Sequence, residues 1–154
     1  MTLETVFSIC STLALLSWIA LFAFYPRKWI YKLLFSGVLV LFALTYLYFI
    51  ILGLSAESEG GFGSLSEIAA LFQKEEALLA GWIHYLAFDL FVGMWITQDA
   101  DKRGINRWLV LPCLFFTFML GPVGLLMYII IRMIRSKQLI QNPFQYETNS
   151  GTII

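Results

Sequence analysis

The chain has 154 residues, of which 60% are hydrophobic and 17% aromatic, whereas only 13% are charged. Soluble domains carry about 25% charged residues, so this composition indicates an integral membrane protein and excludes a small globular enzyme. Ten basic and ten acidic residues leave no net charge. Because no basic patch with interleaved aromatic residues is present, we expect no nucleic-acid partner.

The apolar runs predict an all-α fold, an integral membrane four-helix bundle formed by residues 1–135 and followed by a polar tail at 136–154. About 20 apolar residues in a helix are enough to cross a hydrocarbon core of about 30 Å. Glu4, and the lack of Lys or Arg before the first run, argue against a cleaved signal peptide, so we expect a retained span. The four spans are expected at about residues 3–25, 29–54, 77–97 and 108–132.

Two tyrosines and two cysteines lie within these apolar runs. Tyr46 and Tyr48 either line a cavity or mark the membrane interface near the end of the second span. Cys10 and Cys113 are expected to be small buried hydrophobic residues, because neither their spacing nor their context indicates a disulfide or a metal site.

A short helix is predicted between the second and third spans. Residues 55–64 form a Gly/Ser-rich loop with two acids, which is typical of an aqueous segment. Ser64 followed by Glu67 three residues later is the pattern of a helix start in which the serine caps the first turn. We expect an amphipathic helix at the membrane surface, or else a plain connector.

The predicted fourth span is interrupted in its middle by Gly121-Pro122-Val123-Gly124, which frees backbone carbonyls that a membrane tolerates only inside protein or beside a cavity. Basic residues in the loops after spans one and three favour an outside N-terminus and cytoplasmic loops. Four full spans, our main expectation, would place Arg132 and Arg135 outside, against this rule. If the chain turns back at 121–124, the two short arms return the tail to the cytoplasm.

The third span carries the most costly side chains in the chain, His84 and Asp89, since an Asp at mid-membrane costs about 3 kcal/mol. A helix turns about 100° per residue, so the two lie about 140° apart and do not form a direct pair. Desolvation favours a neutral carboxyl group, so Asp89 is the candidate proton donor and His84 the candidate acceptor. Alternatively, Asp89 ties helices together. Asp99 is expected to be solvated at the interface.

Aromatic residues and small glycines on spans three and four suit a flat, apolar ligand such as a polyene or a lipid, although the same pattern is common in plain packing. No spacing matches a zinc, haem or nucleophile-triad pattern, so we expect neither a metal nor a cofactor. The candidate ligand-binding residues are Trp82, Tyr85, Phe88, Phe91, Trp95, Phe118, Pro122 and Gly124.

The chain resembles the "abscisic acid deficient four" family of small four-span membrane proteins found in plants, algae and bacteria. The resemblance rests on the run from His84 to Gly93, on Leu111-Pro112-Cys113-Leu114-Phe115, and on the run from Gly121 to Leu126. Its plant members are associated with neoxanthin formation from violaxanthin, an epoxide-to-allene isomerisation of a carotenoid. The resemblance implies functional positions at His84, Asp89-Leu90-Phe91 and Pro122-Val123-Gly124.

Three functions are therefore open. The first is an enzyme, a neoxanthin synthase-like isomerase acting on a carotenoid or another isoprenoid without a redox cofactor. The second is a non-catalytic membrane module that binds pigment or lipid. The third is a small proton-coupled transporter, which would need a homo-oligomer to enclose a pathway. Because no plastid-type transit segment is present, we expect a bacterial member of the family in the cytoplasmic (inner) membrane.

Overall fold

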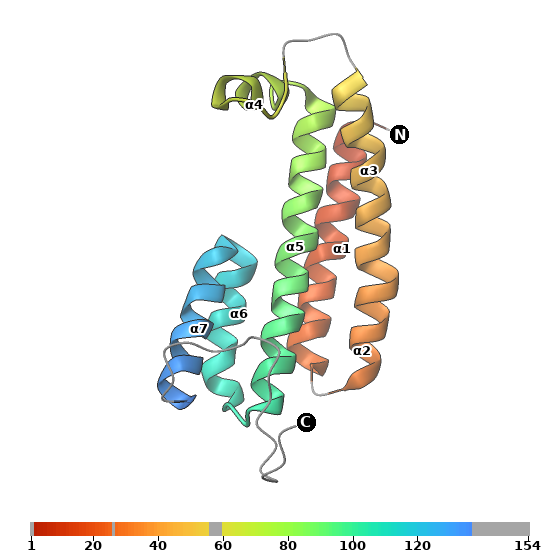
Figure 1. The fold of residues 1–154 in the computed structure, drawn as a ribbon. Helices are drawn as coiled ribbons and strands as arrows, with labels where there is room; N and C mark the ends of the chain where they lie inside the picture. The colour runs from red at the N-terminus through yellow and green to blue at the C-terminus, as the bar shows by residue number, and fades with distance from the viewer. Residues whose placement is uncertain (1, 26, 56–59, 137–154) are drawn as a thin grey trace, which may run out of the picture. The chain divides into compact units, whose positions relative to one another are not determined.

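The computed structural model describes residues 2–25, 27–55 and 60–136, and all the regular elements in these ranges are helices (Figure 1). The chain divides into two units, residues 1–94 and 95–154. Helix α5, Glu75–Lys102, begins in the first unit and ends in the second.

The first predicted span is confirmed as α1, Leu3–Phe24. Thr2 caps its start, where the Thr2 hydroxyl accepts a hydrogen bond from the Thr5 amide at 3.2 Å. The buried residues recur at helical spacing and form one face of the helix, which is how a helix contacts its neighbours: Cys10, Ala14, Ser17, Trp18 and Leu21.

The second span is a continuous helical run from residue 28 to residue 55. It consists of α2, Lys28–Leu33, the π-helical segment η1, Leu34–Leu39, and α3, Val40–Ser55. A π-helix is wider than an α-helix and is rare outside functional or strained positions. Here η1 lies where the run packs on α1.

The short helix after the loop is α4, Leu65–Leu71, and its predicted cap is confirmed. The Ser64 hydroxyl oxygen accepts from the Glu67 amide at 3.2 Å, while the Glu67 carboxylate accepts from the Gly63 amide at 3.1 Å. These bonds satisfy donors that a helix start otherwise leaves free. Residues 56–59 of the loop lie outside the described residues, and the placement of α4 at a membrane surface stays a prediction.

In the first unit, α5 packs beside α1 and α3 (Figure 1). The Trp82 indole N–H donates to the Ser11 hydroxyl on α1 at 3.0 Å. On the other flank, the Lys74 ammonium, just before α5, donates to the Gly53 carbonyl near the end of α3 at 2.6 Å. These bonds fasten the third span to both of its neighbours.

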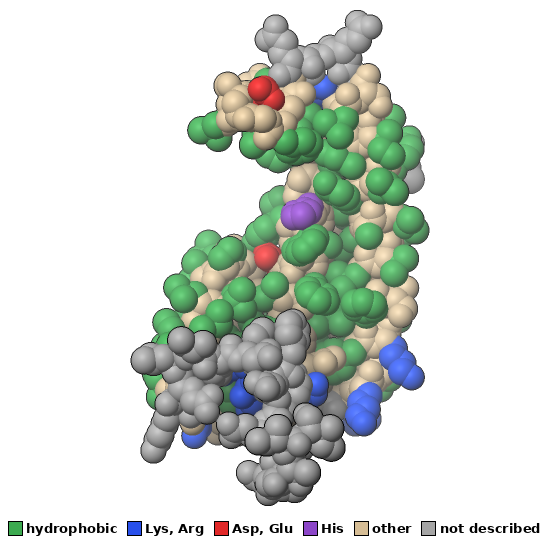
Figure 2. Space-filling view, viewed as in Figure 1, with side chains coloured by type: hydrophobic (Ala, Val, Ile, Leu, Met, Phe, Trp, Pro, Cys, Tyr) green, Lys and Arg blue, Asp and Glu red, His purple; other side chains and the backbone are tan. Residues whose placement is uncertain are grey.

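Among the described residues, three helices are long and apolar enough to cross a membrane, namely α1, the run 28–55 and α5. Many large apolar side chains on these helices are exposed, as Figure 2 shows, and a lipid surrounding suits such a surface because it imposes no hydrophobic penalty. The chain thus has the helices of a multi-pass membrane protein.

The single fourth span predicted at 108–132 is wrong. The structure has two shorter helices there, α6, Arg107–Leu120, and α7, Pro122–Ser136, which pack as an antiparallel hairpin (Figure 1). At 1.5 Å per residue each is about 21–23 Å long, short of a hydrocarbon core of about 30 Å. The alternative turn at 121–124 agrees with this structure. Residues 137–154 of the predicted polar tail lie outside the described residues.

The turn has a clear cause in its sequence. Gly121 has a φ of 49°, a conformation that side chains with a Cβ rarely adopt. Pro122 follows as the first residue of α7, a position that needs no N–H donor and suits the fixed φ of proline. A Cβ on Gly124 would overlap the Thr117 amide and the Cys113 carbonyl, so glycine lets α7 touch α6.

Candidate functional site

Asp89 has a carboxyl oxygen that the protein leaves unsatisfied. Its Oδ2 atom is buried and has no hydrogen-bond partner among the described residues. The Tyr85 hydroxyl, one helical turn earlier, interacts with the same carboxyl group. A buried polar atom without a partner is costly, about 1–3 kcal/mol or more. Such an atom is retained where a ligand or a proton makes use of it.

His84 lies in an aromatic setting on α5. Its ring stacks on Phe88 with centroids 4.4 Å apart and an interplanar angle of 24°, and it meets the Tyr46 ring of α3 at 5.6 Å. The imidazole is exposed, and Figure 2 shows this single histidine of the chain at the surface among hydrophobic side chains. Tyr46 therefore packs on His84 and does not line the cavity described below, and its place at a membrane interface stays a prediction.

His84 and Asp89 serve different neighbours, as the predicted angle between them implies. Trp82 lies 5.5 Å from the Tyr85 ring and 5.5 Å from the Phe7 ring of α1, so the side of α5 that carries Asp89 faces α1. His84 instead faces α3. No hydrogen bond or ion pair within the described part of the chain joins the two side chains.

The predicted ligand-binding residues of the first unit leave much of their surface open. Trp82 is 38% exposed, Phe88 58% and Phe91 46%, and each still contacts another ring. Phe91 meets Phe35 of η1 with centroids 6.4 Å apart. Trp82 lies on the side of α5 that faces α1, about 180° round the helix from Phe91, so these rings form separate aromatic surfaces, each of which can receive a flat apolar molecule.

The other four predicted ligand-binding residues belong to the second unit. Trp95 packs edge-on against Tyr128 at 5.7 Å, Phe118 is half-buried, Pro122 is exposed and Gly124 is buried against α6. A single ligand surface formed by all eight residues stays a prediction.

The second unit contains a buried ionic cluster, which we define as Asp99, Arg103, Tyr128 and Arg132. The Asp99 carboxylate accepts from the Tyr128 hydroxyl at 2.6 Å and from Arg103 Nε at 3.0 Å, and Arg132 Nε is 3.4 Å away. Asp99 is 0% exposed, so the expectation of a solvated residue is wrong. The Arg132 guanidinium also covers the Trp95 ring at 5.7 Å.

Sequence reasoning missed this cluster because its members are far apart in the chain. Only the turn at Gly121 brings α7 back to the end of α5, where Tyr128 and Arg132 meet Asp99. A signal was present nevertheless. Tyr128 and Arg132 are four residues apart, so both lie on one face of a helix that is mostly apolar before its last turn.

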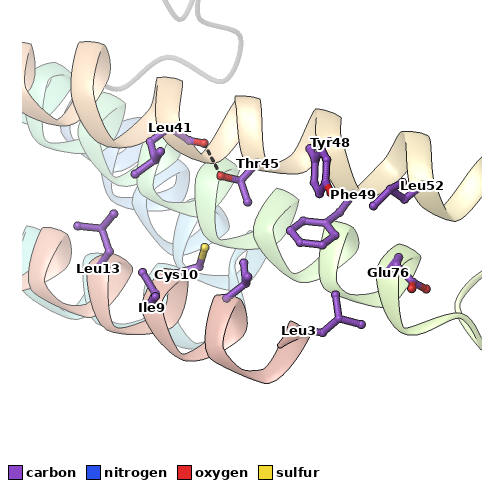
Figure 3. Close-up of a pocket in the computed structure, with 11 residues that line it drawn as sticks. Leu3, Ile9, Cys10, Leu13, Leu41, Thr45, Tyr48, Phe49, Leu52 and Glu76 are labelled. Atoms are coloured by element: carbon purple, nitrogen blue, oxygen red, sulfur yellow. Dashed lines mark hydrogen bonds between the residues drawn. The ribbon is translucent and has the colours of Figure 1, made fainter. Parts of the chain in front are cut away.

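A cavity of about 560 Å³ lies between α1 and α3 in the first unit (Figure 3). Tyr48 lines it, in agreement with one of the two interpretations of that residue, but the cavity contains none of the predicted site residues. Sequence reasoning did not find it because a groove between two helices depends on their packing. Its lining residues are Leu3, Val6, Ile9, Cys10, Leu13, Leu41, Thr45, Tyr48, Phe49, Leu52 and Glu76.

A comparison with protein families shows to which family the chain is related. A family model described as ABA DEFICIENT 4-like matches residues 5–128, which include the three long helices, α6 and the first half of α7. The chain belongs to the ABA DEFICIENT 4-like family. This confirms the resemblance found from the sequence motifs, all of which lie inside the matched range. No curated protein and no solved structure matches the chain.

Proposed function

We propose that this ABA DEFICIENT 4-like protein modifies a carotenoid or a related isoprenoid in a bacterial inner membrane, as an isomerase of a polyene epoxide. The observation that supports the proposal is the buried Asp89 Oδ2 atom, to which no donor within the described ranges of the chain bonds, on the side of α5 that also carries Trp82 and Tyr85. Family membership supports the substrate class, since the family takes its name from abscisic acid.

The chemistry of such an isomerisation needs only a proton transfer. One proton is added to the epoxide oxygen as its C–O bond breaks, and one proton leaves the adjacent polyene carbon as the allene forms. The molecular formula is unchanged, so no electrons enter or leave. A protonated Asp89 can donate the first proton, and the carboxylate that results can accept the second, which returns the enzyme to its starting state.

This scheme assigns different parts to the two predicted catalytic residues. His84 lies on the flank of α5 that faces α3, so it supports ligand binding through its stack with Phe88 rather than accepting the proton. Tyr85 interacts with the Asp89 carboxyl group and positions it. Asp89 is then the one residue that carries the proton in both directions.

The test is expression of the full chain in a host that makes an epoxidised carotenoid, followed by pigment analysis. We expect an isomer of unchanged mass, and a loss of conversion of at least about 100-fold in Asp89→Asn, since general acid–base catalysis contributes about 10²–10⁴-fold. His84→Gln should lower conversion far less than Asp89→Asn, because His84 supports ligand binding and does not transfer the proton. Asp101→Asn, an exposed residue on the same helix, is the matched control. Full conversion by Asp89→Asn would remove the proposal.

A second candidate is a non-catalytic module that binds pigment or lipid, and the exposed aromatic residues Trp82, Phe88 and Phe91 favour it. In that case pigment co-purifies without chemical change, Asp89→Asn retains the pigment, and Phe88→Ala releases it. The third alternative, a proton-coupled transporter, requires a proton flux in vesicles that Asp89→Asn abolishes.

A further inference from the structure

We propose that the cavity between α1 and α3 binds one hydrocarbon chain of a membrane phospholipid whose headgroup carries an ammonium group. This site is separate from the Asp89 side of α5, because Glu76 is the only residue of α5 that lines it. The inference therefore does not depend on the proposed isomerase function.

The dimensions of the cavity match one leaflet of a bilayer. Along α1 it extends from Leu3 to Leu13, and along α3 from Leu52 to Leu41 (Figure 3). Ten or eleven residues of helix are about 15–17 Å long, which is half of a hydrocarbon core of about 30 Å. A molecule that enters from one membrane surface and ends near the midplane fits this depth.

The walls of the cavity suit a saturated or branched chain. Its volume of about 560 Å³ lies within the range of small-molecule sites, about 300–1,000 Å³. Most of the lining is aliphatic, and the middle is opened by two small residues, Cys10 and Thr45. The Thr45 hydroxyl donates to the Leu41 carbonyl at 2.8 Å, so its hydrogen is already used and does not select a polar ligand.

The charged side chains at the outer end of the cavity select the headgroup of the lipid. Glu76 lies there beside Leu3 and Leu52 (Figure 3), and two further acids, Glu4 and Glu75, occupy the first turns of α1 and α5. The nearest basic residue in the chain, Lys74, donates to the Gly53 carbonyl. The ammonium of Lys74 keeps its charge in this bond, so three carboxylates and one ammonium leave these side chains net negative. They therefore attract an ammonium group and repel a headgroup that is purely anionic.

The experiment is native mass spectrometry of the full-length protein in detergent, titrated with phosphatidylethanolamine or with phosphatidylglycerol of identical acyl chains. We expect phosphatidylethanolamine to bind at least about tenfold more tightly, the effect of one hydrogen bond to a charged group. Glu76→Gln should reduce this preference, because Glu76 is the one of the three acids that lines the cavity. Thr45→Phe, which fills the middle of the cavity, should weaken phosphatidylethanolamine binding at least about tenfold, as expected for steric exclusion from a packed site.

Leu44→Phe is the matched control for the cavity, because Leu44 precedes Thr45 on α3, is 61% exposed and does not line the cavity. Equal binding of the two lipids by the unchanged protein would overturn the proposal. Equal effects of Thr45→Phe and Leu44→Phe would also overturn it, and so would displacement of phosphatidylethanolamine by a carotenoid at lower concentration. If Thr45→Phe does not fold, as judged by circular dichroism, the Glu76→Gln titration decides the result alone.

Discussion

Asp89 and Asp99 lie on the same helix, ten residues apart, and the structure treats their carboxyl groups in opposite ways. Asp99 is fully buried and receives hydrogen bonds from Tyr128 and Arg103. The Asp89 carboxyl group interacts with Tyr85, but its buried Oδ2 atom has no hydrogen-bond partner in the described part of the chain. The difference separates two uses of a costly residue in a membrane. A carboxylate whose oxygens are hydrogen-bonded to other helices holds those helices in place. A carboxyl group with an oxygen left without a hydrogen bond is available for chemistry.

If Asp99 holds α7 against the end of α5, the two ends of the α6–α7 hairpin lie on one side of the membrane, and this has the largest observable effect. Because α7 returns to Asp99 at the end of α5, we expect positions 101 and 135 to lie on the same side of the membrane. Asp101→Cys and Arg135→Cys, each in a background with Cys10→Ala and Cys113→Ala, can be labelled with an impermeant maleimide. Labelling from opposite sides would restore the single fourth span and exclude the hairpin.

Asp99→Asn should destabilise the second unit by about 3–5 kcal/mol, because the change leaves buried cationic groups without their charged partner. The thermal unfolding midpoint in detergent, followed by circular dichroism, measures this loss. Asp101→Asn is the matched control, because Asp101 is exposed two residues later on the same helix. Equal midpoints for the two variants would show that the ionic cluster contributes nothing to stability.

Tyr128→Phe should cost less than Asp99→Asn, about 1.5–3 kcal/mol, since it removes one hydrogen bond to a charged group and keeps the packing of the ring. The 2.6 Å bond to Asp99 is the interaction lost. Tyr48→Phe is the control, because the Tyr48 side chain is 61% exposed. A Tyr128→Phe protein as stable as the control would mean that Arg103 alone satisfies the carboxylate.

Gly121→Ala should destabilise the hairpin by about 1–2 kcal/mol, because an alanine at positive φ brings its Cβ against the following carbonyl. Gly121 has a φ of 49°, which alanine can adopt only with strain. Gly37→Ala offers the contrast within a long helix, since a Cβ there would meet only the Leu33 side chain at 3.9 Å. If both substitutions are neutral in thermal unfolding, the turn is not held by this backbone conformation.

The features that could be predicted from the sequence are those set by neighbours in the chain. The three long helices follow from runs of apolar residues, and the Ser64–Glu67 cap follows from a spacing of three residues. The separation of His84 from Asp89 follows from helical geometry alone. Each of these depends on contacts within about one turn, which the sequence specifies directly.

The features that were missed depend on helices that meet in space. The hydropathy of residues 108–132 fits one long span as well as two short helices. The Gly121-Pro122 pair therefore suggested a turn but did not decide between the two arrangements. The burial of Asp99 required Tyr128 and Arg132, which only the turn brings near. The cavity between α1 and α3 likewise depends on how far apart two apolar faces pack.

The most direct test of the contrast between the two aspartates measures pigment conversion and thermal stability in the same Asp89→Asn protein. We expect conversion to fall at least about 100-fold, while the unfolding free energy changes by less than about 1.5 kcal/mol, because only the interaction of the carboxyl group with Tyr85 is weakened. An Asp89→Asn protein that converts the pigment normally, or that unfolds as readily as Asp99→Asn, would show that the Asp89 carboxyl group serves structure and not chemistry.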